Sequence, residues 1–339
     1  MKRFFAILLS AILLLACLFL NGCGEKRPEW MDWSETPAED FQYTLSDDGE
    51  EVYIQKYLGT DERVVIPSYI DDLPVTSLKG VPEGENGLIS EGVFEENTTV
   101  KEVVLPATLQ SIGMSAFGGC TALTTVYLPQ ESALEVVGDS AFWGCTSLKS
   151  LDLSSTSVWI IASRAFVECT ALQEIRFPET LTEIRDRAFY QCTSLTELQF
   201  PSSLKTMGTE AFSHCTSLRR VNIPVQLDLH ALDAICFNEV PALEQITVDE
   251  GRENLDGYAF FELTGKTEII IPASVKKISP DVFFIYGDNV SMKFLGDCPE
   301  LIGGSREFSG HPTFCYDPAT KGWEDCPWKG DHTFKPIEE

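Results

Sequence analysis

A phenylalanine recurs along this chain at a nearly constant spacing. Nine of them follow a small or β-branched residue, at steps of 23, 25, 24, 23, 23, 25, 23 and 23 residues: Phe94, Phe117, Phe142, Phe166, Phe189, Phe212, Phe237, Phe260 and Phe283. So short a period allows one solenoid turn per repeat, and no such turn can bury its apolar face without its neighbours. The spacing therefore predicts a stack of about nine turns of 23–25 residues.

The segment 193–215 shows what one turn contains. Leu198 and Phe200 alternate with polar residues, which predicts a short strand with one buried face. Pro201 ends this strand because it has no N–H for the ladder. Proline recurs at the matching place in other repeats, as Pro67, Pro106, Pro129, Pro178, Pro224 and Pro272. Stacking aligns such strands, so the predicted fold is an α/β-type repeat solenoid, largely β, with one parallel sheet.

These residues resemble a known family. The run Cys-Thr-x-Leu-x-x-apolar-x-apolar-Pro-x-x-Leu-x-x-Ile-Gly-x-x-Ala-Phe is similar to the BspA-like leucine-rich repeat of bacterial surface proteins, closely at 120–142, 169–189 and 192–212 and more loosely over 41–330. The pattern departs at five places: Ser154 and Asp249 replace the proline, Val240 and Leu263 replace the cysteine, and Lys266 replaces the first leucine. The resemblance implies a leucine-rich repeat array in a surface-displayed binding protein. The departures predict a less regular face toward the C-terminal end.

The first 22 residues have the composition of an export signal. Lys2 and Arg3 precede an apolar run over 4–20. The following Leu-Asn-Gly-Cys resembles the bacterial lipobox, which implies a diacylated Cys23. A second lipobox ending at Cys17, an ordinary signal peptide and an uncleaved anchor remain alternatives. All of them place the folded domain outside the cytoplasmic membrane, on its outer face or at the cell surface, with the lipid on Cys23 as the membrane attachment.

The rest of the chain divides by pattern. We expect a tether over 23–40, an N-terminal cap and first degenerate repeat over 41–99, the repeat array over 100–296 and a C-terminal cap over 297–339. Alternation on both sides of Asp48-Gly49 predicts a hairpin in the N-terminal cap. The glycine-rich segment 80–92 reads as a surface loop.

The cysteines fall into two groups. Five share one repeat position, which predicts a ladder of buried thiols: Cys120, Cys145, Cys169, Cys192 and Cys215. In the C-terminal cap, Cys315 and Cys326 are the favoured pair for a disulfide, with Cys298 as the third candidate. No cysteine and histidine spacing fits zinc, and the acidic turn 47–51 lacks the alternation of an EF-hand. We therefore expect neither a metal nor a cofactor.

Catalysis and nucleic-acid binding are both disfavoured. His214 precedes Cys215, but a ladder cysteine is buried while its neighbour faces out, so the two do not form a dyad. The chain has 25 basic and 52 acidic residues, a net charge of −27, or −29 once Lys2 and Arg3 are removed. Such a domain is repelled by nucleic acid and by anionic lipid headgroups. An enzyme with an unrecognised site ranks third among the functions considered.

Two rows of residues between the buried strand positions form the predicted recognition face. One row is Val104, Tyr127, Asp152, Arg176, Gln199, Asn222, Thr247 and Ile270, and the other is Glu102, Thr125, Ser150, Glu174, Glu197, Arg220, Gln245 and Glu268. Their chemistry varies over a repeating core, and aromatic and arginine side chains dominate binding energy. We expect a protein partner, contacted by Tyr127, Asp152, Arg176, Gln199, Asn222, Glu174, Glu197 and Arg220.

Two other readings of the face stay open. A carbohydrate-binding or envelope-organising structural protein would present aromatic platforms there, whereas Tyr127 is the one aromatic residue in the two rows. The face could also be idle and vary by drift.

Overall fold

The computed structural model describes residues 29–83, 88–230, 236–257, 260–263, 266–285, 289–303, 308, 310–326 and 332–337. The chain forms two units, 1–34 and 35–339. The described part of the first is the short 3-10 helix η1 (Glu29–Asp32). The signal segment and Cys23 lie outside the described residues. Among the described residues, no helix is long and apolar enough to cross a membrane.

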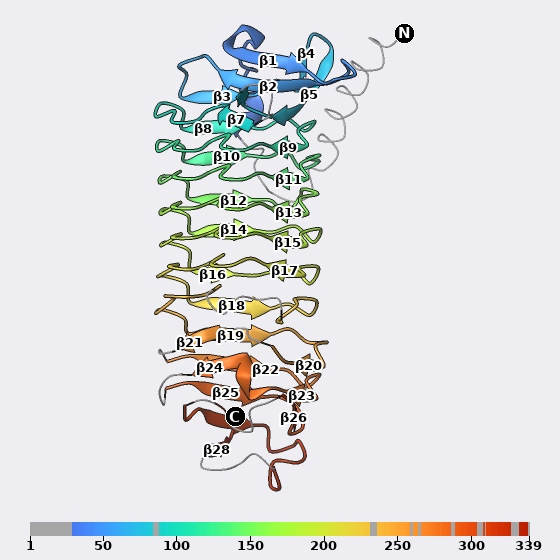
Figure 1. The fold of residues 1–339 in the computed structure, drawn as a ribbon, viewed down its shortest axis with the longest axis vertical. Coiled ribbons are helices and arrows are strands. Elements are labelled where there is room, and N and C mark those ends of the chain that lie inside the picture. Colours follow the sequence, from blue (N-terminus) through green and yellow to red (C-terminus); the bar gives the residue numbers. More distant parts are fainter. Residues whose placement is uncertain are drawn as a thin grey trace. The chain divides into compact units, whose positions relative to one another are not determined.

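The second unit is a largely β solenoid of about eleven turns, which confirms the predicted fold class (Figure 1). One face is a parallel ladder of β3 (Arg63–Val65), β8 (Glu102–Val104), β10 (Thr125–Tyr127), β12 (Ser150–Asp152) and β14 (Glu174–Arg176). It continues as a second ladder of β16 (Glu197–Leu198), β18 (Arg220–Ile223), β19 (Gln245–Val248), β22 (Glu268–Ile271), β25 (Ser291–Phe294), β27 (Thr313–Tyr316) and β28 (Thr333–Pro336). We call this the recognition face.

The prediction of one parallel sheet was wrong, because each turn makes a second short strand. These strands form a second face of β5 (Leu73–Leu78), β9 (Ser111–Ile112), β11 (Val136–Val137), β13 (Ile160–Ile161), β15 (Glu183–Ile184) and β17 (Thr206–Met207). A further ladder consists of β20 (Asn254–Leu255), β23 (Lys277–Ile278) and β26 (Glu300–Leu301). In addition, β21 (Phe260–Leu263) pairs with β24 (Phe283–Ile285), and the 3-10 helix η4 (Pro280–Val282) directly precedes β24. Met207, for example, is the buried residue of β17.

The recurring phenylalanines form the core. The rings of successive turns are parallel and 4.9–5.1 Å apart from Phe94 to Phe212. Each is fully buried; the residue before it is Val93 in the first turn and, in the other five, an alanine with no exposed surface. Turns are also joined here by backbone, since Phe117 N donates to Ala141 O at 2.7 Å and the pattern repeats along the stack. Only a residue as small as alanine lets adjacent turns approach this closely, which explains the Ala-Phe pairs.

The N-terminal end is built from the predicted hairpin. Strands β1 (Phe41–Leu45) and β2 (Val52–Tyr57) are antiparallel, and β2 pairs with β5 of the second face. Residues 35–40, assigned to the tether, belong to the solenoid unit: the 3-10 helix η2 (Ala38–Asp40) lies there, and Thr36 N donates to Val65 O at 2.9 Å. The predicted tether therefore ends before residue 35.

Two other predicted segments differ in the structure. The segment 80–92, predicted to be a surface loop, contains a small antiparallel pair of β6 (Val81–Glu83) and β7 (Leu88–Glu91). Before it in the chain, β4 (Tyr69–Ile70) pairs with β5. Within the predicted C-terminal cap, β27 and β28 extend the parallel ladder from β25. The parallel ladder thus continues past residue 296, with Phe314 of β27 and Phe334 of β28 in register with Met292 of β25.

Candidate recognition site

The register confirms the predicted rows within each of the two ladders of the recognition face. Register places Thr125 beside Glu102 and Ser150, and Asn222 beside Thr247. Asp152, Glu174, Arg176, Glu197, Gln199 and Arg220 are exposed as expected, and Tyr127 is partly buried. Asn222 and Val104, which were expected to be exposed, are buried, with 4% and 6% of their surface exposed.

Asn222 is a structural residue rather than a contact residue. Its Oδ1 accepts from Phe200 N at 2.7 Å, and its Nδ2 donates to Phe200 O at 3.0 Å and to Asp249 Oδ2 at 2.9 Å. In other turns the backbone N–H at the position of Phe200 donates to a backbone carbonyl of the next turn, as Leu105 N does to Tyr127 O. The expectation that Asn222 is exposed on this face was therefore wrong, because its amide is bonded to Phe200 and Asp249 of the neighbouring turns.

The ladder of the recognition face is interrupted between β14 and β16. Neighbouring strands pair up to β14 and again from β16, but these two, which are described in full, form no ladder with each other. On the second face the same two turns remain joined through β15 and β17. The turns are thus spread apart on the recognition face alone.

Two bulky core residues lie at this interruption. The position that ends the strand is leucine, isoleucine or valine in most turns, and at the C-terminal end it is Phe294 and Tyr316, on the paired strands β25 and β27. In the two turns at the interruption it is Phe177 and Phe200. Their stacked rings are 5.7 Å apart, wider than the 4.9–5.1 Å of the central stack. Each also meets the central stack edge-on, Phe177 at Phe189 and Phe200 at Phe212. The interruption thus coincides with two adjacent rings that pack both on each other and on the central stack.

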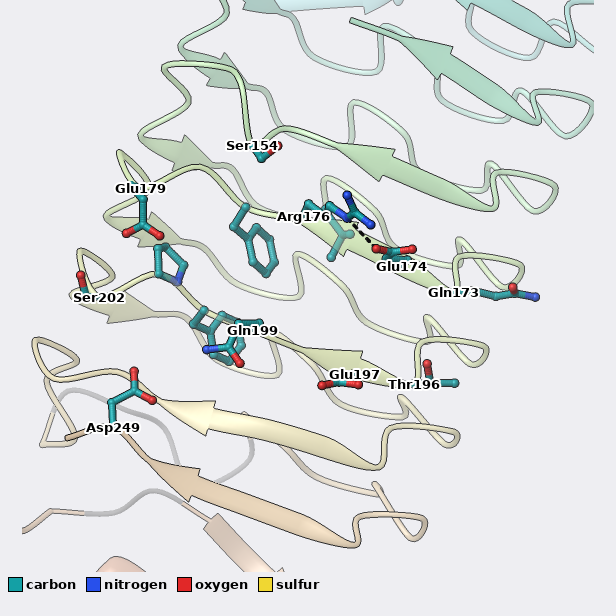
Figure 2. Close-up of a pocket in the computed structure, with 14 residues that line it drawn as sticks. Ser154, Gln173, Glu174, Arg176, Glu179, Thr196, Glu197, Gln199, Ser202 and Asp249 are labelled. Carbon is teal, nitrogen blue, oxygen red and sulfur yellow. Dashed lines mark hydrogen bonds and ion pairs between the residues drawn. The ribbon is translucent and has the colours of Figure 1, made fainter. Parts of the chain in front are cut away.

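A hollow of about 820 Å³ lies over this interruption. Figure 2 shows Arg176 lying against Glu174 on one strand, with Glu197 and Gln199 on the next. Glu179, Ser202 and Asp249 also line it, and sequence reasoning missed them. The sequence signal that points to this place is a phenylalanine in two successive repeats, Phe177 and Phe200, at a position that is leucine in the three preceding repeats.

The charges of the hollow are mostly paired. Arg176 Nε lies 2.7 Å from Glu174 Oε1, and its Nη1 lies 3.6 Å from Asp152 Oδ2. The hydrogen bond and the charge of Glu174, with the charge of Asp152, raise the pKa of Arg176 above its ordinary value. Burial raises the pKa of the Asp249 carboxyl, while the hydrogen bond from Asn222 opposes this rise. The hollow therefore offers a fixed guanidinium among carboxylates and amides.

The other predicted anchor lies outside the hollow. Tyr127 donates its hydroxyl to Glu102 Oε1 at 3.1 Å, and burial followed by this hydrogen bond raises the pKa of Tyr127. Arg220 Nη1 lies 3.8 Å from Glu197 Oε2. Cross-strand pairs of this kind orient the side chains along the face.

The predicted cysteine ladder is present and buried. Each thiol donates to the phenylalanine carbonyl of the preceding turn, from Cys120 to Phe94 at 2.9 Å through Cys215 to Phe189 at 3.3 Å. Cys215 is thus turned away from His214, whose Nδ1 lies 3.3 Å from Glu239 Oε2. Among the described residues no group of three or more His, Cys, Asp or Glu could hold a metal.

The architecture defines the class of protein: this is a leucine-rich repeat solenoid. The model of the BspA type leucine rich repeat region matches in six copies over residues 87–190 and 160–286, more than half of the chain. The chain therefore belongs to the BspA-type leucine-rich repeat family, as its sequence pattern predicted. Proteins of this family are surface-associated in bacteria, and leucine-rich repeats are generally non-enzymatic protein-recognition modules.

Three solved structures illustrate the similarity. The T. pallidum leucine-rich repeat protein TpLRR is 25% identical, covers 77% of this chain and 86% of its own, and has a TM-score of 0.36. A leucine rich cell surface protein of Faecalibacterium prausnitzii is 18% identical over 80% and 96% of the two chains, with a TM-score of 0.40. A leucine-rich repeat protein of Bacteroides ovatus is 20% identical over 91% and 100%, with a TM-score of 0.41. No curated protein matches the chain.

Proposed function

We propose that this protein is an exported, lipid-anchored binding protein that recognises a protein partner through its recognition face. The observation that carries the proposal is the hollow between β14 and β16 on that face. There, chemically varied side chains lie on a repeating core, and the carboxylates of Glu174 and Asp152 orient the Arg176 guanidinium. Preorganised arginine side chains in a concave surface are typical centres of protein recognition.

A carbohydrate-binding role has less support. Sugar-binding surfaces rely on exposed aromatic plates, whereas Tyr127, the one aromatic residue in the two rows, is partly buried and donates its hydroxyl to Glu102. The hollow itself exposes carboxylates, amides and one guanidinium. This composition fits the polar surface of a protein better than a sugar ring.

The test compares two similar ion pairs, one on each of the two faces. Arg176 and Glu174 lie on the recognition face, and Arg185 and Glu183 lie on the second face, each pair with an Nε to Oε1 distance of 2.7 Å. A partner is first captured from the cell surface with the chain lacking its first 22 residues. Arg176→Ala should then weaken its binding at least about tenfold, a loss of about 1.4 kcal/mol.

The matched variant separates the site from the general charge of the protein. Arg185→Ala removes the same guanidinium from the second face and should leave the dissociation constant within about twofold. Equal losses in both variants, or a loss in Arg185→Ala alone, would move binding away from the hollow. Titration calorimetry with both variants and the captured partner gives the comparison directly.

The anchor is proposed at Cys23 on the strength of the preceding apolar run and lipobox-like residues. Acylation of this cysteine carries the protein into the membrane fraction. Cys23→Ser should abolish acyl labelling and release the protein, whereas Cys17→Ser should change neither. Acylation that persists in Cys23→Ser would place the lipid elsewhere.

A further inference from the structure

Two cysteines near the C-terminal end of the solenoid lie in direct contact. The sulfur atoms of Cys298 and Cys326 are 2.9 Å apart, although 28 positions separate the residues in the chain. Cys326 is buried, with 5% of its surface exposed, and Cys298 is partly exposed. A covalent S–S bond is about 2.05 Å long, so bonding requires a shift of less than about 1 Å.

Backbone contacts hold the two segments together independently of the sulfurs. Cys298 N donates to Lys321 O at 2.9 Å, and Lys321 N donates to Asp297 Oδ1 at 2.8 Å. Gly322 has a φ of +85°, and a Cβ added there would lie 3.2 Å from Cys298 Cβ. The loop before Cys326 is therefore fitted closely against Cys298.

A buried tryptophan fixes the same loop from the core side. Trp323 is 3% exposed, stacks on Tyr316 with ring centres 5.4 Å apart, and packs against Phe294 at 5.0 Å. Its Nε1 donates to Gly296 O at 3.2 Å, two residues before Cys298. Because the loop is already ordered, little conformational entropy remains to be lost when the sulfurs bond.

We propose that Cys298 and Cys326 form a disulfide when the protein meets a disulfide oxidant such as oxidised glutathione. The partly exposed Cys298 loses its proton and attacks a glutathione sulfur, which releases one glutathione thiolate. Cys326 then loses its proton and attacks Cys298 in this mixed disulfide, which releases the second. The two cysteines lose two electrons in total, and the oxidant's disulfide is reduced to two thiols.

The geometry points to this pair rather than to Cys315 and Cys326. Cys315 lies on β27 between Lys293 and Lys335 of the neighbouring strands. Its neighbour Phe314 is fully buried, so the alternation along the strand turns Cys315 to the outer side. The resulting bond would clamp the loop that precedes β28 against the segment that follows β25.

Peptide mapping distinguishes the candidate pairs. Trypsin cleaves after Lys293, Arg306, Lys321 and Lys329, so each of the three cysteines falls in its own peptide. After oxidation with glutathione disulfide at pH 8 and alkylation, peptide 294–306 should be linked to 322–329 with the loss of two hydrogens. Oxidation should also raise the Tm, by about 5–10 °C for a loop of this length.

Variants provide the controls. Cys315→Ser should retain the linked peptides and the Tm rise, and Cys298→Ser should lose both. A link between 307–321 and 322–329, or alkylation of both Cys298 and Cys326 after oxidation, would overturn the proposal. The wild-type map decides this even if Cys298→Ser does not fold.

Discussion

At the scale of single residues, Asn222 shows how a polar side chain replaces strand pairing. Its amide satisfies both backbone groups of Phe200 inside the fold. Asn222→Ala leaves these groups without their partner, so we expect the free energy of unfolding to fall by about 2 kcal/mol. Urea denaturation measures this loss. Gln199→Ala, on the exposed side of the same region, should change it by less than about 0.5 kcal/mol. Equal values for the two variants would contradict a structural role.

The thiol of Cys215 gives a pH prediction. Burial raises its pKa from 9.0 to about 12. Below pH 9 both folded and unfolded states keep the proton, so the stabilisation is complete. Above pH 9 the unfolded state releases the proton while the folded state keeps it, and stability falls as pH rises toward about 12.

The matched variant isolates this contribution. Serine keeps a hydroxyl donor for Phe189 O but does not ionise in this range. Between pH 9.5 and 10.5 the free energy of unfolding should fall less steeply in Cys215→Ser than in wild type, by about 1.4 kcal/mol per pH unit. Urea titrations at the two pH values measure the slopes. Parallel slopes would show that the folded thiol titrates normally.

At the scale of strands, Phe177 and Phe200 lie where the recognition face opens. Their rings stack 5.7 Å apart beside the unpaired β14 and β16, while β15 and β17 stay paired. Replacing both with leucine, the residue of the earlier turns, should let the two strands pair. Amide hydrogen exchange at Ile175 and Gln199 should then slow at least about tenfold, because paired amides exchange only after local opening.

The intact ladder provides the internal control for this variant. Leu151 lies on β12, which already pairs with β14, so its exchange rate should stay the same. Unchanged or faster exchange at Ile175 and Gln199 would show that something other than ring volume separates the strands. The same variant should also weaken partner binding, because the hollow narrows.

At the scale of the whole molecule, charge acts against the compact state. The net charge of −27 is distributed over the chain, and compaction brings like charges together. Raising NaCl from 10 to 150 mM shortens the Debye length from about 30 to about 8 Å. We expect the Tm to rise by several degrees over this range. A Tm that falls would show that the surface ion pairs stabilise more than the net charge destabilises.

The sequence by itself determined the class of fold, the family and the core. The repeating Ala-Phe pair fixes the period of the stack, and the buried thiols and proline-ended strands follow from it because each turn repeats one environment. The two rows of the recognition face also followed, since alternation along a strand assigns each residue to one side. These features depend on local pattern, which a repeat protein displays many times over.

The tertiary structure alone decided the features that depend on contacts between turns. The second face, the opening between β14 and β16 and the burial of Asn222 arise from how much volume one turn presents to the next. The contact of Cys298 with Cys326 arises from the path of a loop pinned by Trp323. Pattern identifies which side of a strand a residue occupies, but packing against the neighbouring turn decides whether that side is open.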